Sequence, residues 1–171
     1  MEQRTLGPTD LDAYMQENDI PGEILHLDVP TPTVVAAALA VGTQPERIVK
    51  SILFLVAGLP VLAITCGQIY VDRRTLAGVY RVGRKKVKLA NPETVLKETG
   101  FEVGAMPPFG HRDPLPTWID ERVLEQPEVF AGGGAENALV RLAPADIVHV
   151  TQARVIDLLT PPGNNPNREE N

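Results

Sequence analysis

Two short apolar runs joined by a tight connection constrain the fold of this chain more than any other feature of the sequence. The runs are VKSILFLV at residues 49–56 and PVLAITC at residues 60–66, and Ala57, Gly58 and Leu59 connect them. Both runs are short and rich in β-branched residues, so they predict strands rather than helices. Their almost continuous apolar character indicates a hairpin inside a covered sheet.

Helix and strand signals mix irregularly around this hairpin. Helices are predicted at residues 9–18, from Pro32 to Gly42, at 72–80, from Asn91 to Gly100, and from Pro144 onward. Further strands are predicted at residues 23–28, in KVKLA, and near TWID, EVFAG and ALVRLA. Because strands and helices do not alternate regularly, a doubly wound parallel sheet fits poorly, and the sequence predicts an α+β fold with a mixed, largely antiparallel sheet.

Chain length and composition predict a single domain. The 171 residues, 43% of them hydrophobic, suffice for one core and are too few for two ordinary domains. We expect that domain to span residues 1–160 and residues 161–171, PPGNNPNREEN, to form a disordered tail. Neither a membrane-spanning apolar run nor a secretory leader is visible, so we expect a cytoplasmic protein without membrane contact.

Charge is distributed unevenly along the chain. A net charge of −6 argues against a protein that coats nucleic acid, and we expect no DNA partner. Residues 73–88 nevertheless contain seven basic side chains and no acidic one: Arg73, Arg74, Arg81, Arg84, Lys85, Lys86 and Lys88. Such a segment is either an ordinary solvated surface or a landing site for a few phosphates, with Arg84, Lys85 and Lys86 at its centre.

Cysteine and histidine are too sparse for a metal centre. The single cysteine, Cys66, excludes an internal disulfide and lies in an apolar run, so it is interpreted as a small core residue. The three histidines are scattered and have no zinc-ligand spacing. We therefore expect no metal and no other cofactor.

Lys50 is an unusual residue for an apolar strand. Its neighbours Ile48, Val49, Ile52 and Leu53 are all apolar. Burying an ammonium group without a partner costs several kcal/mol, so this side chain must reach either a surface or a ligand. Two interpretations remain open, which are snorkelling at a strand end and participation in a binding site.

A proline-rich and glycine-rich segment predicts a loop of fixed shape at residues 101–117, FEVGAMPPFGHRDPLPT. Within it lies GAMPPFG at residues 104–110. Glycine lets a backbone come close to a bound group and proline restricts the remainder, so exposed N–H groups of such a loop can be held ready for an anion. A rigid turn used only for packing would have the same composition.

Three successive glycines follow a predicted strand in AGGGAEN, residues 131–137. They cost chain entropy and offer no side chain for packing, which is understandable where a ligand or another backbone approaches closely. The segment is not a nucleotide-binding fingerprint, because the GxGxxG pattern and the P-loop pattern with its lysine are both absent.

The order of these motifs resembles the YbaK/ProX family of aminoacyl-tRNA editing domains, which includes the prolyl-tRNA synthetase-associated domain and its stand-alone forms. IVKSILF is followed by a hairpin, a helix ending in TGF, GAMPPFGH with PLP behind it, the acidic WID and VFAGGG. The resemblance runs from about Thr31 to Val150. It implies a sheet curved toward a partly open barrel and flanked by helices, and an enzyme that deacylates mischarged aminoacyl-tRNA in trans.

The resemblance also implies which residues form the site. The essential lysine of the family corresponds to Lys50, and its Gly-x-x-x-Pro motif corresponds to Gly104 and Pro108. Family members commonly have a second glycine where this chain has Ala105, which bears on how closely the backbone approaches a substrate. The residues expected to bind substrate are Ala105, Met106, Pro107, Phe109, Gly110, His111, Asp120, Gly132, Gly133 and Gly134.

Ester hydrolysis passes through a tetrahedral oxyanion, which backbone N–H groups of residues 104–108 are expected to stabilise. Lys50 would hold the terminal ribose or a phosphate and stabilise negative charge, while water or a functional group of the substrate acts as nucleophile. His111 either positions water or bonds to backbone, and Asp120 either orients Lys50 or caps a turn. The amino acid stays open, because members that destroy cysteinyl-tRNA, alanyl-tRNA and other mischarged species share these motifs.

Other functions remain compatible with the sequence. A non-catalytic module that captures tRNA acceptor ends, or a synthetase partner, would keep the basic segment and the glycine-rich pocket but would have no use for a buried lysine. A hydrolase acting on a small-molecule ester is a further alternative, although nothing else in the chain specifies such a substrate.

Overall fold

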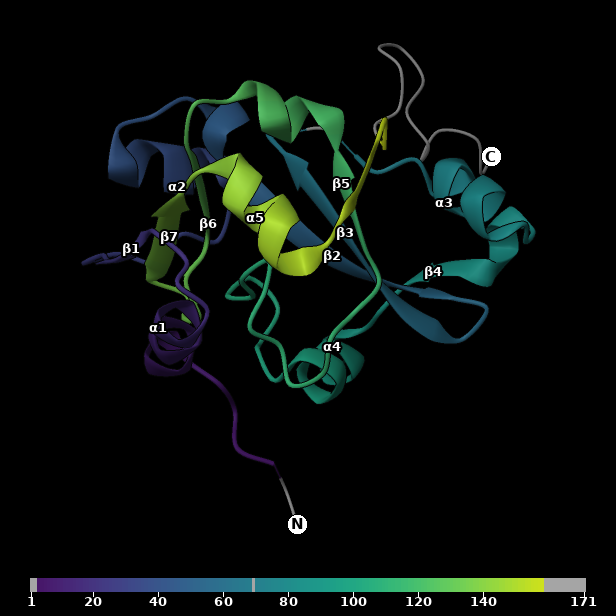
Figure 1. The fold of residues 1–171 in the computed structure, drawn as a ribbon, viewed down its shortest axis with the longest axis horizontal. Coiled ribbons are helices and arrows are strands. Elements are labelled where there is room, and N and C mark those ends of the chain that lie inside the picture. The colour runs from purple at the N-terminus through teal and green to yellow at the C-terminus, as the bar shows by residue number, and fades with distance from the viewer. Residues whose placement is uncertain (1–2, 69, 159–171) are drawn as a thin grey trace.

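The computed structural model of this protein describes residues 3–68 and 70–158, which form two sheets and the helices around them (Figure 1). The α-helices are α1 (Pro8–Glu17), α2 (Val34–Val41), α3 (Arg73–Tyr80), α4 (Pro92–Thr99) and α5 (Pro144–Thr151). The strands are β1 (Glu23–His26), β2 (Val49–Val56), β3 (Leu59–Cys66), β4 (Val87–Leu89), β5 (Thr117–Asp120), β6 (Val129–Gly132), β7 (Ala138–Leu142) and β8 (Arg154–Ile156). Short 3₁₀ helices are η1 (Pro45–Arg47), η2 (Arg84–Lys86) and η3 (Glu121–Glu125).

The larger sheet is mixed, the smaller sheet is antiparallel, and neither closes into a barrel. The larger sheet has the order β4-β2-β3-β5-β8, with antiparallel pairing of β2 to its neighbours β3 and β4 and parallel pairing of β5 to its neighbours β3 and β8. The smaller sheet, β1-β7-β6, is antiparallel throughout. A parallel bridge between Ile48 and Phe130 joins the two sheets. The predicted α+β fold with a mixed, partly open sheet is confirmed.

The β2–β3 hairpin forms as the sequence predicts, with a turn one residue shorter. Leu59 pairs with Val56, so Ala57 and Gly58 alone make the turn, and both have positive φ angles, 50° and 84°. Two residues in this conformation match the right-handed twist of the flanking strands. Side chains on one face of the hairpin pack in a cluster with Ile147 of α5, and those on the other face pack in a cluster with Leu76 of α3. The hairpin is therefore covered on both faces (Figure 1).

Helix boundaries follow local capping chemistry. The Asn91 side chain accepts a hydrogen bond of 2.8 Å from the Thr94 N–H at the start of α4, and Pro92 occupies the first helical position. Gly100 ends α4 in the left-handed region at φ 89°. At α2 the Thr33 side chain accepts from the Ala36 N–H, and Gly42 ends the helix at φ 68°. Asn91, Gly100 and Gly42 stand where the sequence pattern predicts the helix ends, whereas the cap at Thr33 was not predicted.

Some elements were not predicted from the sequence. Strand β8 and the short helix η3 lie in segments without a clear periodic pattern. The tail predicted at residues 161–171 lies outside the described residues. Within residues 3–68 and 70–158, no helix combines the length and the apolar character needed to cross a membrane.

Asp120 ties together three segments at the end of β5. Its side chain is fully buried, and it accepts hydrogen bonds from the N–H of Arg122 at 2.9 Å and from the N–H of Leu158 at 2.7 Å. The Arg122 guanidinium contacts the same carboxylate at 3.2 Å and reaches the exposed Asp157 at 2.9 Å. The Asp120 carboxylate therefore caps η3 and fixes the chain that follows β8.

Replacing Asp120 is expected to destabilise the protein much more than replacing Asp157. Asp120→Ala removes a helix cap and leaves the N–H of Leu158 without its acceptor, so it should lower the free energy of unfolding by about 2–4 kcal/mol. Asp157→Ala removes an exposed ion pair with Arg122 and should cost less than about 1 kcal/mol. Urea-induced unfolding measures both values, and equal losses would contradict this account of Asp120.

Candidate functional site

A cavity of about 220 Å³ lies between β2 and the smaller sheet. It is lined by residues 31–34, Ala37, residues 48–52, Gly104, Met106, Gly132 and Leu139. The lining comes from four parts of the chain, which are the start of α2, the first half of β2, the loop after α4 and the β6–β7 turn region. Only the folded chain brings these segments together.

Lys50 enters this cavity from β2, where it is half-buried and pairs across the hairpin with Thr65. Burial lowers the pKa of its ammonium group below the ordinary lysine value. The neighbours Val49 and Leu53 are buried in the core, so the strand itself is anchored. The structure thus holds a cation at the wall of a partly apolar cavity that Gly104 also lines.

The loop at residues 104–108 presents few free backbone donors. The Ala105 N–H donates to the Glu102 carbonyl at 3.1 Å, which closes a turn, and the two prolines carry no N–H. Gly104 has φ 86°, a conformation that side chains disfavour, and a Cβ there would meet nothing within 4 Å. Within the described ranges, the N–H groups of Gly104 and Met106 donate to no backbone acceptor, and both residues line the Lys50 cavity.

The three glycines of the β6–β7 turn allow this loop to pack closely. A Cβ at Gly132 would overlap the carbonyl oxygen of Met106 and lie 2.9 Å from that of Ala105. The Gly134 N–H donates to the Ala105 carbonyl at 2.8 Å, and Gly134 itself has φ 97°. Of the two interpretations of AGGGAEN, close approach of another backbone is the one that the structure shows. The turn thereby holds the loop beside Lys50.

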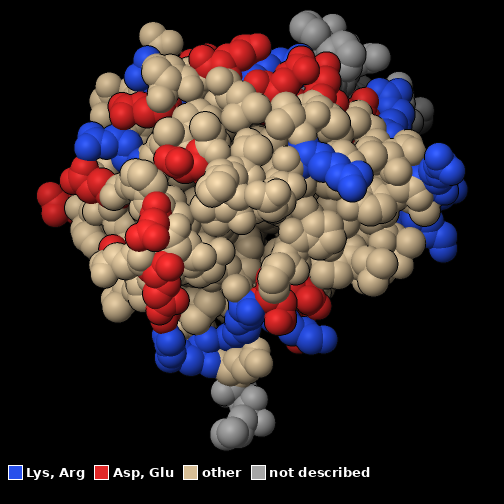
Figure 2. Space-filling view, in the orientation of Figure 1, with Lys and Arg blue, Asp and Glu red and all other residues tan. Residues whose placement is uncertain are grey.

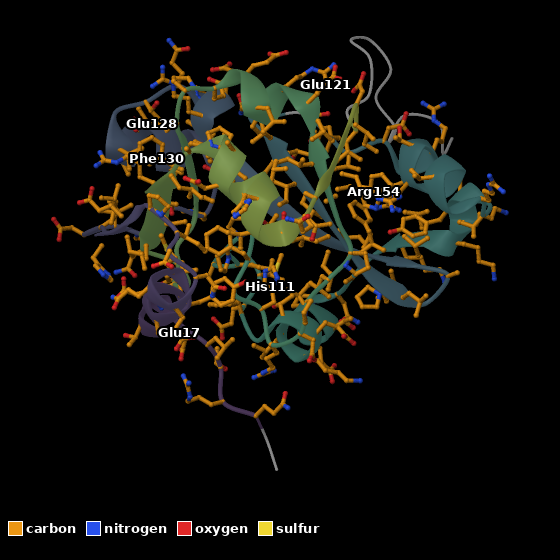
Figure 3. The ribbon with its side chains drawn as sticks, viewed as in Figure 1. Glu17, His111, Glu121, Glu128, Phe130 and Arg154 are labelled. Carbon is orange, nitrogen blue, oxygen red and sulfur yellow. The ribbon has the colours of Figure 1, made fainter. Side chains whose placement is uncertain are left out.

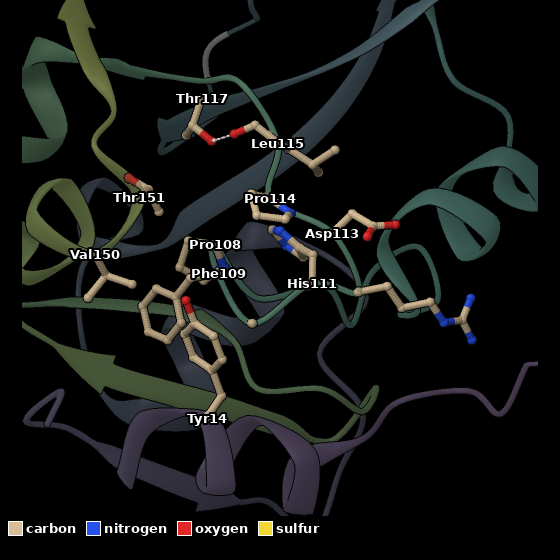
Figure 4. Close-up of a pocket in the computed structure, with 12 residues that line it drawn as sticks. Tyr14, Pro108, Phe109, His111, Asp113, Pro114, Leu115, Thr117, Val150 and Thr151 are labelled. Atoms are coloured by element: carbon tan, nitrogen blue, oxygen red, sulfur yellow. Dashed lines mark hydrogen bonds between the residues drawn. The ribbon is translucent and has the colours of Figure 1, made fainter. Parts of the chain in front are cut away.

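Several residues expected to bind substrate lie elsewhere. Pro108, Phe109, Gly110 and His111 line a separate cavity of about 320 Å³ (Figure 4). Phe109 stacks on Tyr14 there, with ring centroids 5.9 Å apart. Pro107 is buried and lines neither cavity, and Ala105 and Gly133 are buried in the packing of the loop against the glycine turn.

Asp120 also lies outside the Lys50 cavity. Its carboxylate is fully buried and accepts hydrogen bonds from the N–H groups of Arg122 and Leu158. Of the two roles considered for Asp120, it therefore caps a turn and does not orient Lys50. Of the two roles considered for His111, the structure shows the bond to backbone, because its Nε2 lies 2.8 Å from the Pro107 carbonyl oxygen. A carbonyl only accepts hydrogen bonds, so Nε2 carries the proton.

The sequence reasoning missed the part of the cavity that lies before and within α2. Thr31, Pro32, Val34 and Ala37 line it, and so does Leu139 on β7. Thr33, which caps α2, also lines it. No local pattern identifies these residues as site residues, because their position depends on how the smaller sheet packs against the edge of β2.

Cys66 is poorly suited to act as a nucleophile. Cys66 is buried in the core cluster, as predicted, and burial raises the pKa of its thiol to about 11, with a further contribution from Asp120. The thiol therefore stays protonated at neutral pH and is a poor nucleophile. In the part of the chain that the structure describes, no three His, Cys, Asp or Glu side chains gather in a group that could hold a metal.

Sequence comparison matches most of this chain to known proteins. The family model that matches residues 28–150 is described as "Aminoacyl-tRNA editing domain". The chain is 26% identical over 143 residues to "Uncharacterized protein YwhH" of Bacillus subtilis, covering 83% of this chain and 87% of that protein. It is 33% identical over 85 residues to "Proline--tRNA ligase" of Thermotoga neapolitana, covering 48% of this chain but only 14% of the ligase.

Solved structures show the same fold. One carries a provisional assignment as a trans-editing enzyme for prolyl tRNA synthetase. It superposes on this chain with a TM-score of 0.84 at 32% sequence identity, and the match covers 90% of this chain and 97% of that chain. Another is hypothetical protein APE2540, with a TM-score of 0.81 at 27% identity, covering 88% of this chain and 99% of that chain.

Burial of His111 makes the folded protein sensitive to mild acid. Desolvation lowers the pKa of its imidazole below the ordinary value of about 6.5 that applies to the unfolded chain. As the pH falls below about 6.5, the unfolded chain therefore takes up a proton before the folded protein does, and stability decreases. Above that pH the contribution of His111 to stability is fully present.

His111→Gln retains an N–H donor for the Pro107 carbonyl and does not titrate. Between about pH 5 and 7, the free energy of unfolding of this variant should fall less steeply with decreasing pH than that of the wild type, by at most about 1.4 kcal/mol per pH unit. A wild-type slope in His111→Gln would contradict the assignment.

Proposed function

Because the chain belongs to the family of aminoacyl-tRNA editing domains, we propose that it hydrolyses the ester bond of mischarged aminoacyl-tRNA as a free-standing, trans-acting deacylase. One observation carries the proposal: Lys50, Gly104 and Met106 line the same cavity. In the proposal, the cation from the strand and the two backbone donors from the loop act on one small ligand in this cavity. If the loop at residues 104–108 served only for packing, Gly104 and Met106 would not need to line the same cavity as Lys50.

The proposed reaction needs no strong nucleophile, because an aminoacyl ester is already activated. Water, or a functional group of the substrate itself, attacks the carbonyl carbon and produces a tetrahedral oxyanion. The N–H groups of Gly104 and Met106 stabilise this oxyanion, and one such donor is typically worth a factor of about 10² to 10³ in rate. The bond to the ribose oxygen then breaks, the oxygen takes a proton, and the net products with water are a free amino acid and uncharged tRNA.

Lys50 holds the terminal ribose or its phosphate in this proposal and balances the negative charge that develops. Burial lowers its pKa without removing the attraction between the ammonium group and an anion. The buried residues of β2 restrict the motion of the backbone at Lys50, so the ammonium group is positioned before the substrate arrives. The balancing of developing charge distinguishes an enzyme from a module that only captures tRNA ends, because no charge develops on a ligand that does not react.

The tRNA body is proposed to contact the basic segment at residues 73–88, with Arg84, Lys85 and Lys86 at its centre. Figure 2 shows Lys and Arg side chains gathered along the edge that carries α3 and β4. Lys88 pairs with Leu55 on β2, five residues from Lys50, so about 17 Å of strand separates the basic segment from the cavity. Phosphates of the acceptor arm can therefore bind here while the terminal ribose occupies the cavity.

A synthetase-related substrate is part of the proposal. An 85-residue match to a proline–tRNA ligase and a structural match to a chain assigned to prolyl-tRNA synthetase editing both support tRNA mischarged by that enzyme. A synthetase pocket separates amino acids that differ by one methylene by only about 1–3 kcal/mol. Hydrolysis of the wrong ester at a second site restores the missing specificity.

Lys50→Ala is expected to lower kcat/KM for deacylation by at least about a hundredfold, because it removes the cation that positions the ester and offsets its charge. The measurement is the rate of ester loss from a panel of mischarged tRNAs, of which the wild type must cleave at least one. Lys97→Ala, at an exposed position on α4, is the control and should retain wild-type activity. Full activity of Lys50→Ala on every tRNA that the wild type cleaves would refute the mechanism.

Replacing Arg84, Lys85 and Lys86 together by glutamate should raise KM for tRNA and change kcat little, because phosphate contacts add binding energy far from the ester. The variant should also show a weaker dependence of tRNA affinity on salt concentration, since fewer counterions are released. Arg141→Glu, on β7 of the smaller sheet, provides a control for the added negative charge. An unchanged KM and salt dependence would exclude the basic segment from tRNA binding.

A further inference from the structure

A separate cavity of about 400 Å³ lies where the end of α3, the start of β5 and the start of β8 meet. Its walls include Tyr80 of α3, Trp118 of β5 and Arg154 of β8, and it shares no lining residue with the Lys50 cavity. Figure 3 shows Arg154 between α5 and α3, on the face turned toward the viewer. The proposed deacylation chemistry does not use this cavity.

The aromatic wall of this cavity is held in place by its own contacts. Trp118 and Arg154 are register partners on adjacent parallel strands, and the guanidinium carbon lies 5.5 Å from the centre of the indole ring. The Trp118 Nε1–H donates to the Tyr80 hydroxyl at 2.9 Å, and the two rings meet edge to face with centroids 6.0 Å apart. The indole is almost fully buried, so it supports the guanidinium from below.

Arg154 differs from several other arginines in how its charge is balanced. Arg122 and Arg141 pair with carboxylates, whereas no carboxylate within residues 3–68 and 70–158 forms an ion pair with Arg154. Arg154 is exposed, and its guanidinium lies over the Trp118 ring. A planar cation that rests on an indole on one side can stack on a second π-system on the other.

The surroundings of the cavity favour a ligand with phosphates. Tyr80, at the cavity wall, is followed directly by Arg81, and the basic helix η2 packs next to α3. Aromatic or arginine platforms beside a basic surface are the features with which proteins bind single-stranded nucleic acid without reading its sequence. The volume of about 400 Å³ also leaves room for a nucleobase and part of its sugar.

We propose that this cavity receives an unpaired nucleobase from the single-stranded 3′ end of tRNA, stacked on the Arg154 guanidinium while the basic segment binds neighbouring phosphates. The inference rests on the proposed function, because that function supplies the RNA. Two strands, β3 and β5, separate β2 from β8, so about 14 Å lies between the strands of Lys50 and Arg154. The bound base therefore belongs to a nucleotide upstream of the one whose ribose carries the amino acid.

Trp118 is the only tryptophan of the chain, so its fluorescence reports directly on this cavity. The experiment titrates the full-length protein with a four-nucleotide single-stranded RNA of acceptor-end sequence and with an abasic oligomer of equal length and charge. The base-bearing RNA should change the Trp118 emission saturably and bind at least about fivefold more tightly than the abasic oligomer. Equal affinities, or an emission that no RNA changes, would overturn the proposal.

Variants of Arg154 separate stacking from charge. Arg154→Met keeps a flexible apolar chain over the indole and should abolish the preference for the base-bearing RNA. Arg154→Lys keeps the positive charge but loses the planar surface, so it should bind both oligomers with nearly equal affinity. Arg141→Met, on β7, is the control and should behave as the wild type. A full base preference in Arg154→Lys or Arg154→Met would overturn the stacking assignment.

Deacylation assays distinguish failure of this inference from failure of the proposed function. With mischarged tRNA, Arg154→Met should raise KM and leave kcat unchanged, because the variant leaves the Lys50 cavity intact. If the wild type and Arg154→Met have the same KM, the nucleobase site is refuted while the deacylase stands. If the wild type cleaves no mischarged tRNA, the proposed function is refuted, and the oligomer titration still decides whether an unpaired base binds.

Discussion

Close contact between two backbones, the glycine turn at residues 132–134 and the loop at residues 105–106, is the constraint on which the candidate site depends. A side chain at Gly132 would overlap the Met106 carbonyl, and the Gly134 N–H holds the Ala105 carbonyl at 2.8 Å. The smaller sheet carries the glycine turn, and β2 of the larger sheet carries Lys50. The packing of the loop against the turn thus holds Gly104 and Met106 at the cavity that Lys50 also lines. A larger residue at Gly132 would push this loop away from the turn.

The rest of the architecture stabilises the two sides of this contact. Apolar clusters on both faces of the β2–β3 hairpin fix the strand that bears Lys50. On the loop side, His111 donates to the Pro107 carbonyl and packs edge to face on Phe101, with ring centroids 6.2 Å apart. The proline residues limit how far the backbone between these anchors can move. The result is a preorganised arrangement, which is the condition under which backbone donors stabilise an oxyanion effectively.

Local chemistry explains what the sequence predicts well. Asn91, Pro92 and Gly100 determine the ends of α4 by capping and by backbone conformation, and the hairpin follows from two apolar runs around a short turn. Lys50 and Gly104 were expected to face one hollow, and they line one cavity. Composition could not show on which side of the loop each residue lies, so Phe109 and His111 were grouped with the Lys50 site although they line another cavity. Strand β8 and the contribution of α2 depend on tertiary packing alone, and no periodic pattern marks them.

The central claim is that the loop amides and Lys50 act on the same substrate. A crystal structure with a non-hydrolysable analogue, in which an amide replaces the ester between an amino acid and the ribose of adenosine, tests it most directly. The account predicts that the analogue carbonyl accepts a hydrogen bond from the N–H of Gly104 or Met106 and that the ribose or phosphate lies beside the Lys50 ammonium. An analogue bound outside this cavity, or one whose carbonyl points away from both amides, would contradict it.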